Sequence, residues 1–330
     1  MPDELDLLRR TNPVPANGPY FGDGPLDHGA ERRLELLLGE GESRPARLRT
    51  PRARLRWGLA ATAVVLATTL TTLLGGPGSP PAVAAPRPLA VRAHSTAVPL
   101  HRMAELAAAA ATDGSPGLRK GTHVQSWSLG MSDDGPPVTL PQERVVRWNA
   151  DDSHTELVVA TDPRHPGRPV LSDDDGGAPH LVADGQVLSR TTYPPSWSDA
   201  PPEAHPPHDP AALRAYLTET ARTGTGSLST SELLDGVQEL LDNWTLGARE
   251  SAALVRILAD ARGLRPVGQV TDRLGRPAQA YTYDGPGERR MLILDPRTGA
   301  VLGLETTFTQ DDHRYGVKAG DVMEYSAWMR

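Results

Sequence analysis

The chain has 330 residues, a formal net charge of −7 and no Cys. A chain without Cys forms no disulfide and carries no thiol chemistry, and an acidic chain lacks the basic face of a general nucleic-acid-binding protein, so no direct nucleic-acid partner is expected. The length is sufficient for two domains and for a folded unit with a sizeable hydrophobic core.

Residues 1–56 are predicted to be a cytoplasmic tail. Residues 1–12 match a short amphipathic helix, with acidic residues early and basic residues late, as the helix dipole favours. The Pro- and Gly-rich stretch 13–25 predicts a loop or disorder, and a second helix is predicted from residue 27 or 28 to Leu38. Helices this short do not fold alone, so the tail is either disordered or folds against a partner.

Residues 57–74, with the sequence WGLAATAVVLATTLTTLL, contain no charged residue. A helix of this length spans roughly 27 Å, which is close to the hydrocarbon thickness of a bilayer. The segment from Arg44 to Arg56 carries six Arg and no acid, a pattern that suits anionic lipid head groups. By the positive-inside rule it places the N-terminus in the cytoplasm and the C-terminus outside. We therefore predict a cell-membrane protein with a single, uncleaved transmembrane helix.

Two other interpretations of this stretch stay open. A buried core helix is also apolar, but it rarely runs this far without a charge. A cleaved signal segment is the second interpretation, because residues 81–85 (PAVAA) contain the small-residue pattern of a cleavage site near residues 83–85. Against cleavage, a signal peptide starts near the first residue of a chain and not after 56 residues.

Residues 75–98 are rich in Pro, Gly and Ala and are predicted to be a linker, and residues 99–330 are predicted to form the extracytoplasmic domain. A helix is predicted from Leu100 to Ala111. Stretches rich in β-branched and aromatic residues predict four antiparallel strands at residues 122–131, 143–149, 153–161 and 186–192. Polar, Pro-rich loops are predicted at residues 163–185 and 194–208.

Three helices are predicted next. Asp209-Pro210 is an N-cap followed by Pro at the first helical position. Ser229 and Glu232 are spaced as a capping box, and they open a helix with a regular stripe of apolar residues that ends at Trp244. A third helix stops at Gly263.

The end of the chain predicts strands again, at residues 267–273, 278–284, 290–294 and 300–309, with an edge strand at 325–329. The turn from Asp295 to Gly299 predicts a hairpin in which Gly299 has a positive φ. Strands, then helices, then strands is the order of an α+β domain with helices on one face of an antiparallel sheet.

Several stretches resemble a known family. The opening MPDELDLLRR, the apolar stretch, VGQVTDRLGRPAQAYTY and LDPRTGAVLGLET are similar to an uncharacterised family of actinobacterial single-span membrane proteins, often encoded beside extracytoplasmic-function sigma factors. The resemblance covers most of the chain. It implies an outer domain of the LolA/RseB type, with a curved antiparallel sheet and helices in its concavity. The chain departs from the family in its tail, where Pro13 to Pro25 interrupts the helix that other members have.

No set of residues predicts catalysis, a cofactor or a metal. His205 and His208 are close in sequence but stand in a Pro-stiffened loop without a metal-binding helix motif. Residues 173–177 (DDDGG) lack the alternating ligands of a calcium loop. Four Trp residues either line an apolar groove or belong to the core: Trp127, Trp148, Trp197 and Trp244.

Two functions follow from these patterns, and neither is enzymatic. The first is a regulatory or sensor protein whose tail contacts a sigma factor or another cytoplasmic protein. The second is a tethered LolA-like module that binds a lipid or other apolar ligand in the concavity of its sheet. The second function requires an apolar cavity of several hundred Å³.

Overall fold

The computed structural model describes residues 17–18, 21–22, 86–132, 135–173, 178–195, 205–221 and 228–329. It divides the chain into two compact units, residues 1–70 and 71–330. In the first unit, β1 (Asn17–Gly18) pairs antiparallel with β2 (Phe21–Gly22), so part of the stretch predicted as a loop pairs as strands.

The predicted transmembrane helix, the two predicted tail helices and the residues around the predicted cleavage site lie outside the described residues. Within the described ranges, no helix has both the length and the apolar character needed to cross a bilayer.

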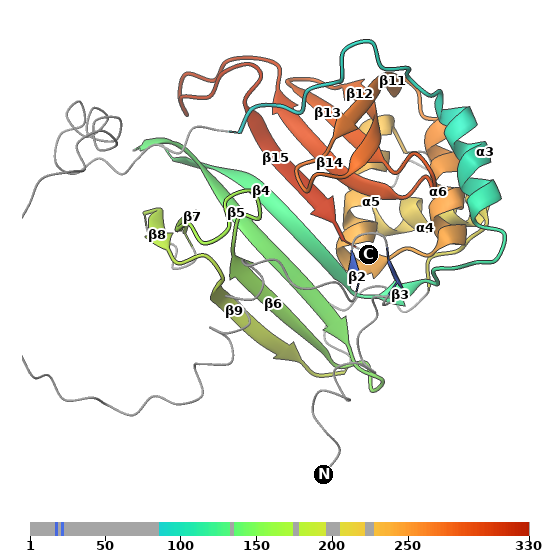
Figure 1. The fold of residues 1–330 in the computed structure, drawn as a ribbon, viewed down its shortest axis with the longest axis horizontal. Coiled ribbons are helices and arrows are strands. Elements are labelled where there is room, and N and C mark those ends of the chain that lie inside the picture. Colours follow the sequence, from blue (N-terminus) through green and yellow to red (C-terminus); the bar gives the residue numbers. More distant parts are fainter. Residues whose placement is uncertain are drawn as a thin grey trace, which may run out of the picture. The chain divides into compact units, whose positions relative to one another are not determined.

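The second unit contains a nine-stranded antiparallel sheet with the order β11-β12-β13-β14-β15-β4-β5-β6-β9 (Figure 1). Its strands are β4 (Thr122–Ser132), β5 (Gly135–Trp148), β6 (His154–Ala160), β9 (Gln186–Tyr193), β11 (Arg265–Thr271), β12 (Pro277–Asp284), β13 (Glu288–Leu294), β14 (Val301–Phe308) and β15 (Val322–Trp328). Two short strand pairs accompany it: β3 (Arg119–Lys120) with β10 (Trp244–Thr245), and β7 (Val170–Ser172) with β8 (His180–Val182).

The sheet differs from the prediction in two places. β15 is not an edge strand, because it pairs with β14 on one side and β4 on the other and so joins the early strands to the late ones. β7 and β8 lie inside a stretch predicted to be a polar loop. Their buried apolar side chains, Val170, Leu171 and Val182, are too few to show a strand pattern in the sequence.

Four helices are found among the described residues: α3 (Leu100–Ala110), α4 (Pro210–Thr220), α5 (Thr230–Asn243) and α6 (Ala248–Ala259). The predicted caps are present. Asp209 accepts a hydrogen bond from Ala212 N, and Ser229 and Glu232 form both hydrogen bonds of a capping box. In Figure 1 the helices gather beside the half of the sheet formed by β11 to β15, and β5, β6 and β9 extend away from them.

The main hydrophobic core lies between these helices and one face of the sheet, called here the helix face. Buried side chains of all four helices contact sheet residues Val124, Tyr281, Leu292, Leu304 and Trp328. The opposite face, called the outer face, carries a second cluster built around Trp127, Tyr325, Ile293 and Ala327. The predicted α+β architecture, with helices on one face of an antiparallel sheet, is therefore confirmed.

Candidate functional site

An open cleft of about 710 Å³ lies on the helix face, beside the polar side of α5. We call it the α5 cleft. Its lining comes from α5, β5 and the strands β13 to β15: Arg144, Asp235, Gln238, Glu239, Asp242, Asn243, Glu288, Arg290, Thr306, Met323 and Glu324. Because it collects side chains from distant parts of the chain, the cleft forms only when the sheet is complete.

Both Arg residues of the α5 cleft are already paired. Arg290 donates from Nη1 to Asp235 Oδ1 at 2.5 Å and from Nε to Glu288 Oε1 at 2.7 Å. Arg144 donates from Nε to Glu156 Oε1 at 2.5 Å. These pairs link α5 with β13 and β5 with β6. Within the described residues, no ion pair holds the other acidic side chains of the cleft, which are Glu239, Asp242 and Glu324.

Asp242 has the most perturbed carboxyl of the α5 cleft. Its Oδ1 accepts a hydrogen bond from Trp328 Nε1 at 2.9 Å. Burial raises the pKa of the Asp242 carboxyl to about 6, Trp328 and Arg144 oppose this rise, and the nearby Glu324 and Glu239 add to it. This carboxyl therefore exchanges its proton in the mildly acidic range.

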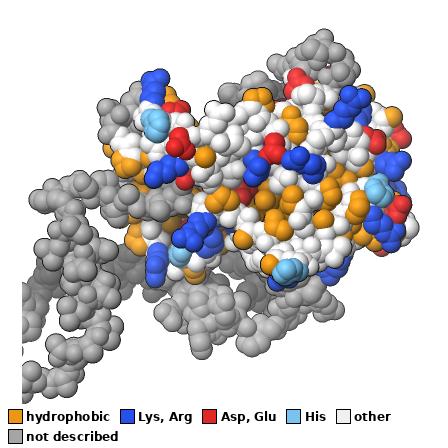
Figure 2. Space-filling view, turned by 90° about the horizontal axis from the view of Figure 1, so that it is seen from above, with side chains coloured by type: hydrophobic (Ala, Val, Ile, Leu, Met, Phe, Trp, Pro, Cys, Tyr) orange, Lys and Arg blue, Asp and Glu red, His pale blue; other side chains and the backbone are white. Residues whose placement is uncertain are grey.

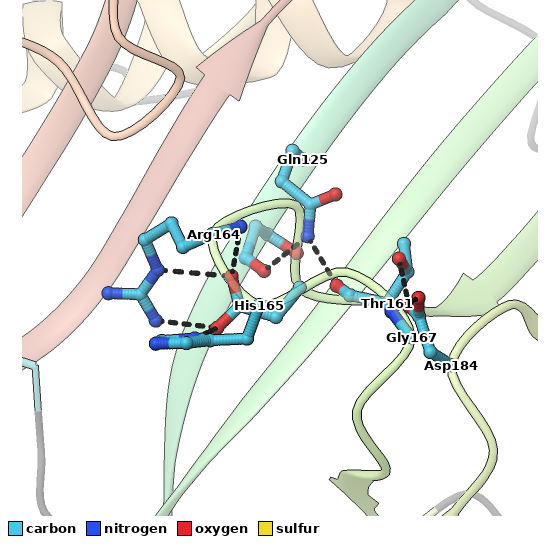
Figure 3. A network of polar contacts seen from close by, with 8 residues as sticks. Gln125, Thr161, Arg164, His165, Gly167 and Asp184 are labelled. Carbon is cyan, nitrogen blue, oxygen red and sulfur yellow. Dashed lines mark hydrogen bonds and ion pairs between the residues drawn. The ribbon is translucent and has the colours of Figure 1, made fainter. Parts of the chain in front are cut away.

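A polar network pins the loop after β6 to the outer face (Figure 3). Asp162, which is 6% exposed, accepts from Arg164 Nη2 at 2.7 Å and from His165 Nδ1 at 3.1 Å. Burial alone would raise the pKa of Asp162, but the hydrogen bonds from Arg164 and His165 outweigh burial and lower it. The guanidinium of Arg164 also lies over the ring of Trp127, 5.1 Å from its centroid.

The other half of the network joins this loop to the turn before β9. Thr161 Oγ1 donates to Asp184 Oδ1 at 2.6 Å, and Gly167 N donates to Asp184 Oδ2 at 2.6 Å. Gln125 Nε2 of β4 donates to Thr161 O at 2.9 Å. Figure 3 shows Gln125 between the two halves. Asp162 accepts from donors of its own loop, and Asp184 accepts from donors of the loop after β6, so the network has a structural role.

A second open cleft of about 710 Å³, the outer cleft, lies on the outer face. Residues 86–98, predicted as part of a linker, run along one side of it and supply Pro88, Leu89 and Val91 to its wall. Its rim carries Asp284, which accepts from Arg289 Nε at 2.6 Å and from Arg265. Figure 2 shows charged side chains of both signs next to hydrophobic ones on the surface seen from above.

The three candidate Trp residues that the structure describes do not line a common groove. Trp127 and Trp244 are both 1% exposed but belong to the clusters on opposite faces of the sheet. Trp148 stacks on His154 at the end of β5, with ring centroids 4.2 Å apart, and Trp197 lies outside the described residues. Trp127 and Trp244 therefore belong to the core.

The candidate metal ligands are only partly described. His205 packs edge-on against Trp244, with ring centroids 5.3 Å apart, and of the acidic run only Asp173 falls in a described range. Within the described residues, no group of three or more His, Asp or Glu side chains is placed to hold a metal ion.

Sequence reasoning found the apolar stripe of α5 but missed the cleft beside it. One local signal was available: Asp242 stands in the last turn of α5, where the helix dipole disfavours a negative charge. The residues facing it from β5, β13 and β15 carry no signal of their own, because their proximity depends on the pairing of the sheet.

Neither a family model nor a curated protein matches the chain. Among solved structures, the Pseudomonas aeruginosa MucA/MucB complex is similar at 16% identity over 69% of this chain and 53% of that chain, with a TM-score of 0.24. The chain thus spans about half the length of the MucA/MucB chain that it matches. The dehydratase domain from the CurK module of curacin polyketide synthase is similar at 10% identity over 72% of this chain and 82% of that one, with a TM-score of 0.13. At these TM-scores neither similarity establishes a shared fold or function.

Proposed function

We propose that the chain is a membrane-anchored, non-enzymatic regulatory protein. In this proposal residues 57–74 span the cell membrane and residues 1–56 face the cytoplasm, where they bind a regulator such as an extracytoplasmic-function sigma factor. Residues 99–330 face outward and bind a partner there. The uncharged stretch, the six Arg before it and the family resemblance support this topology.

The choice between a regulatory protein and a lipid-binding module rests on one observation, which is that side chains fill the interior of the domain. Six apolar side chains of α5 and its C-cap are buried against the other helices and the sheet: Leu233, Leu234, Val237, Leu240, Leu241 and Trp244. A gap between the end of α5 and the sheet measures only about 20 Å³, which is room for a single water.

A lipid-like ligand requires an enclosed apolar space of several hundred Å³. The core side chains occupy the place between α5 and the sheet where the LolA-like alternative puts such a ligand. The two clefts of about 710 Å³ are instead open, and charged side chains contribute to both. This packing favours a protein partner over an apolar ligand, and the alternative finds no support in it.

Co-purification tests the proposal. The tagged full chain, solubilised in detergent, is expected to retain the sigma factor encoded beside its own gene, and a chain lacking residues 1–56 is expected to lose it. A tail carrying the same composition in scrambled order serves as the control for non-specific binding. Equal retention by all three chains, or no retention by the full chain at micromolar concentration, would contradict the proposal.

A further inference from the structure

Residues 87–95, near the start of the described part of the domain, form a strap that lies against the outer face and reaches the edge of the sheet at β11. The strap turns at residues 92–95, where Ser95 N donates to Arg92 O at 3.2 Å. It contains no helix or strand. Leu89 is partly buried against the cluster around Trp127 and Tyr325, and Arg87, Pro88 and residues 90–94 are exposed. A segment outside the helices and strands, with one partly buried apolar anchor, separates from a folded domain more easily than a strand or helix does.

One end of the strap is bound to a buried ion pair. Leu89 N donates to Glu305 Oε1 at 2.8 Å, and Arg273 Nη2 donates both to Glu305 Oε2 at 2.5 Å and to Arg87 O at 3.0 Å. The side chains of Arg273 and Glu305 are only 5% and 1% exposed. Glu305 thus accepts with one oxygen from Arg273, in the turn between β11 and β12, and with the other from the strap.

The other end of the strap covers the edge of the sheet at β11. Arg92 N donates to Gln269 O at 2.8 Å, and Gln269 N donates to Ser95 Oγ at 3.0 Å. β11 is the last strand of the sheet on this side. The strap therefore satisfies two backbone groups that an uncovered edge strand would present to another chain.

β11 is shaped to accept the strap. Its pairing with β12 shifts register between Pro266 and Gly268, and Gly268 has a φ of +128°. A Cβ at Gly268 would stand 2.6 Å from Ser95 Oγ and 3.0 Å from Val91 Cγ1. The bulge and the missing side chain together make the space that the strap fills.

We propose that the strap is a releasable cover. It separates from the outer face while the sheet and helices stay folded, and its separation widens the outer cleft and frees the edge of β11. This goes beyond the proposed function, because strap release depends neither on the membrane helix nor on binding by the tail.

Thiol labelling of the full chain measures strap release directly, because the natural chain has no Cys. Two single substitutions supply the probes: Ser95→Cys at the strap contact with β11, and Ser251→Cys in α6, where Ser251 is 2% exposed. The release variant is Leu89→Ala, which removes the apolar anchor without leaving a buried charge unpaired. We expect Leu89→Ala to raise the labelling rate of the Ser95→Cys thiol about tenfold. The labelling rate of the Ser251→Cys thiol should not change.

A second release variant distinguishes strap release from a general loss of stability. Arg92→Pro removes the N–H that donates to Gln269 O and leaves the core untouched. A labelling rate that rises at Ser95→Cys and not at Ser251→Cys in this variant too supports the proposal. Equal increases at both thiols in both variants, or no increase at Ser95→Cys in either, would show that the strap opens only when the whole domain unfolds and would overturn it.

Discussion

Asp242 illustrates what a buried carboxyl does to this domain. It stands in the last turn of α5, and its carboxylate accepts a hydrogen bond from Trp328 Nε1. Glu239 and Glu324 are nearby. Its neighbours Asp235 and Glu288 are instead paired with Arg290. Asp242 is thus a site where the charged form of an acid is disfavoured by the fold itself.

The pH dependence of stability follows from this position. The pKa of Asp242 is about 6 in the folded domain and 3.8 in its ordinary state, so the folded state binds the proton more tightly. The free energy of unfolding therefore falls as the pH rises from about 4 to about 6, by at most about 3 kcal/mol from this group.

Asp242→Asn is expected to remove this dependence, since the amide oxygen still accepts from Trp328 Nε1 and carries no charge. The variant should be more stable than the natural 71–330 unit at pH 7 and similar to it near pH 4. Urea unfolding at the two pH values measures both differences. If the free energy of unfolding changes equally with pH in the two proteins, the charged form of Asp242 costs the folded state no free energy, and the prediction is wrong.

Gly299 is a second residue whose role is set by its surroundings. Its φ is +68°, as predicted for the turn between β13 and β14, and a Cβ there would stand 2.6 Å from Ala107 Cβ of α3. Gly275 has a similar φ of +82°, with nothing within 4 Å of its added Cβ. The two positions share the backbone strain and differ in packing.

Gly299→Ala should therefore destabilise the domain by more than Gly275→Ala. Backbone strain costs both variants roughly 1–2 kcal/mol, and the clash with α3 adds roughly 1–3 kcal/mol to Gly299→Ala alone. Thermal unfolding of both variants gives the difference. Equal losses would mean that α3 moves aside without cost.

At the scale of elements, the helices were predictable and part of the sheet was not. Capping residues such as Asp209 and Ser229 act within one turn, so the sequence predicts α4 and α5 close to their observed starts. The central place of β15 depends on pairing with β4, far away in the chain, and no local pattern reports such pairing. β5 begins at Gly135, although the sequence predicts its start at Glu143. Pro residues in its first part are unfavourable inside a sheet, but this part pairs only with β4 and so lies at an edge, where Pro is tolerated.

The buried stripe of α5 gives a prediction at this scale. Leu240 and Leu241 are 4% and 5% exposed, and truncating either to Ala should cost roughly 2–5 kcal/mol of stability. Glu239→Ala, on the exposed side of the same helix, is the control and should change stability by less than about 0.5 kcal/mol. A melting temperature unchanged in both Leu variants would mean that α5 does not hold the sheet.

At the scale of the whole molecule, the clefts are products of assembly. The α5 cleft joins β5, α5 and the last strands, and the outer cleft adds the strap before α3. Sequence patterns predict the contributing helix and strands, but they predict the strap as part of a linker and do not predict the surface that these elements make together. The same patterns do predict how the chain is oriented in a membrane, because that depends on the charges flanking one stretch.

Replacing all six Arg from Arg44 to Arg56 with Glu should invert or scramble the orientation of the chain, since the distribution of basic residues sets it. Reporter fusions placed after Leu74 measure the side on which the domain resides. In the natural sequence the reporter should be extracytoplasmic. A cytoplasmic reporter in the natural sequence would contradict the predicted topology.

The central claim is that the tail binds a cytoplasmic regulator, and a binding titration tests it most directly. Residues 1–56 are titrated with the sigma factor encoded beside the gene, with a scrambled tail as the control. The account predicts saturable binding to the natural tail with a Kd of about 1 µM or tighter, equivalent to about −8 kcal/mol, and none to the scrambled tail. No binding of the natural tail at micromolar concentrations, or equal binding of both tails, would contradict the account.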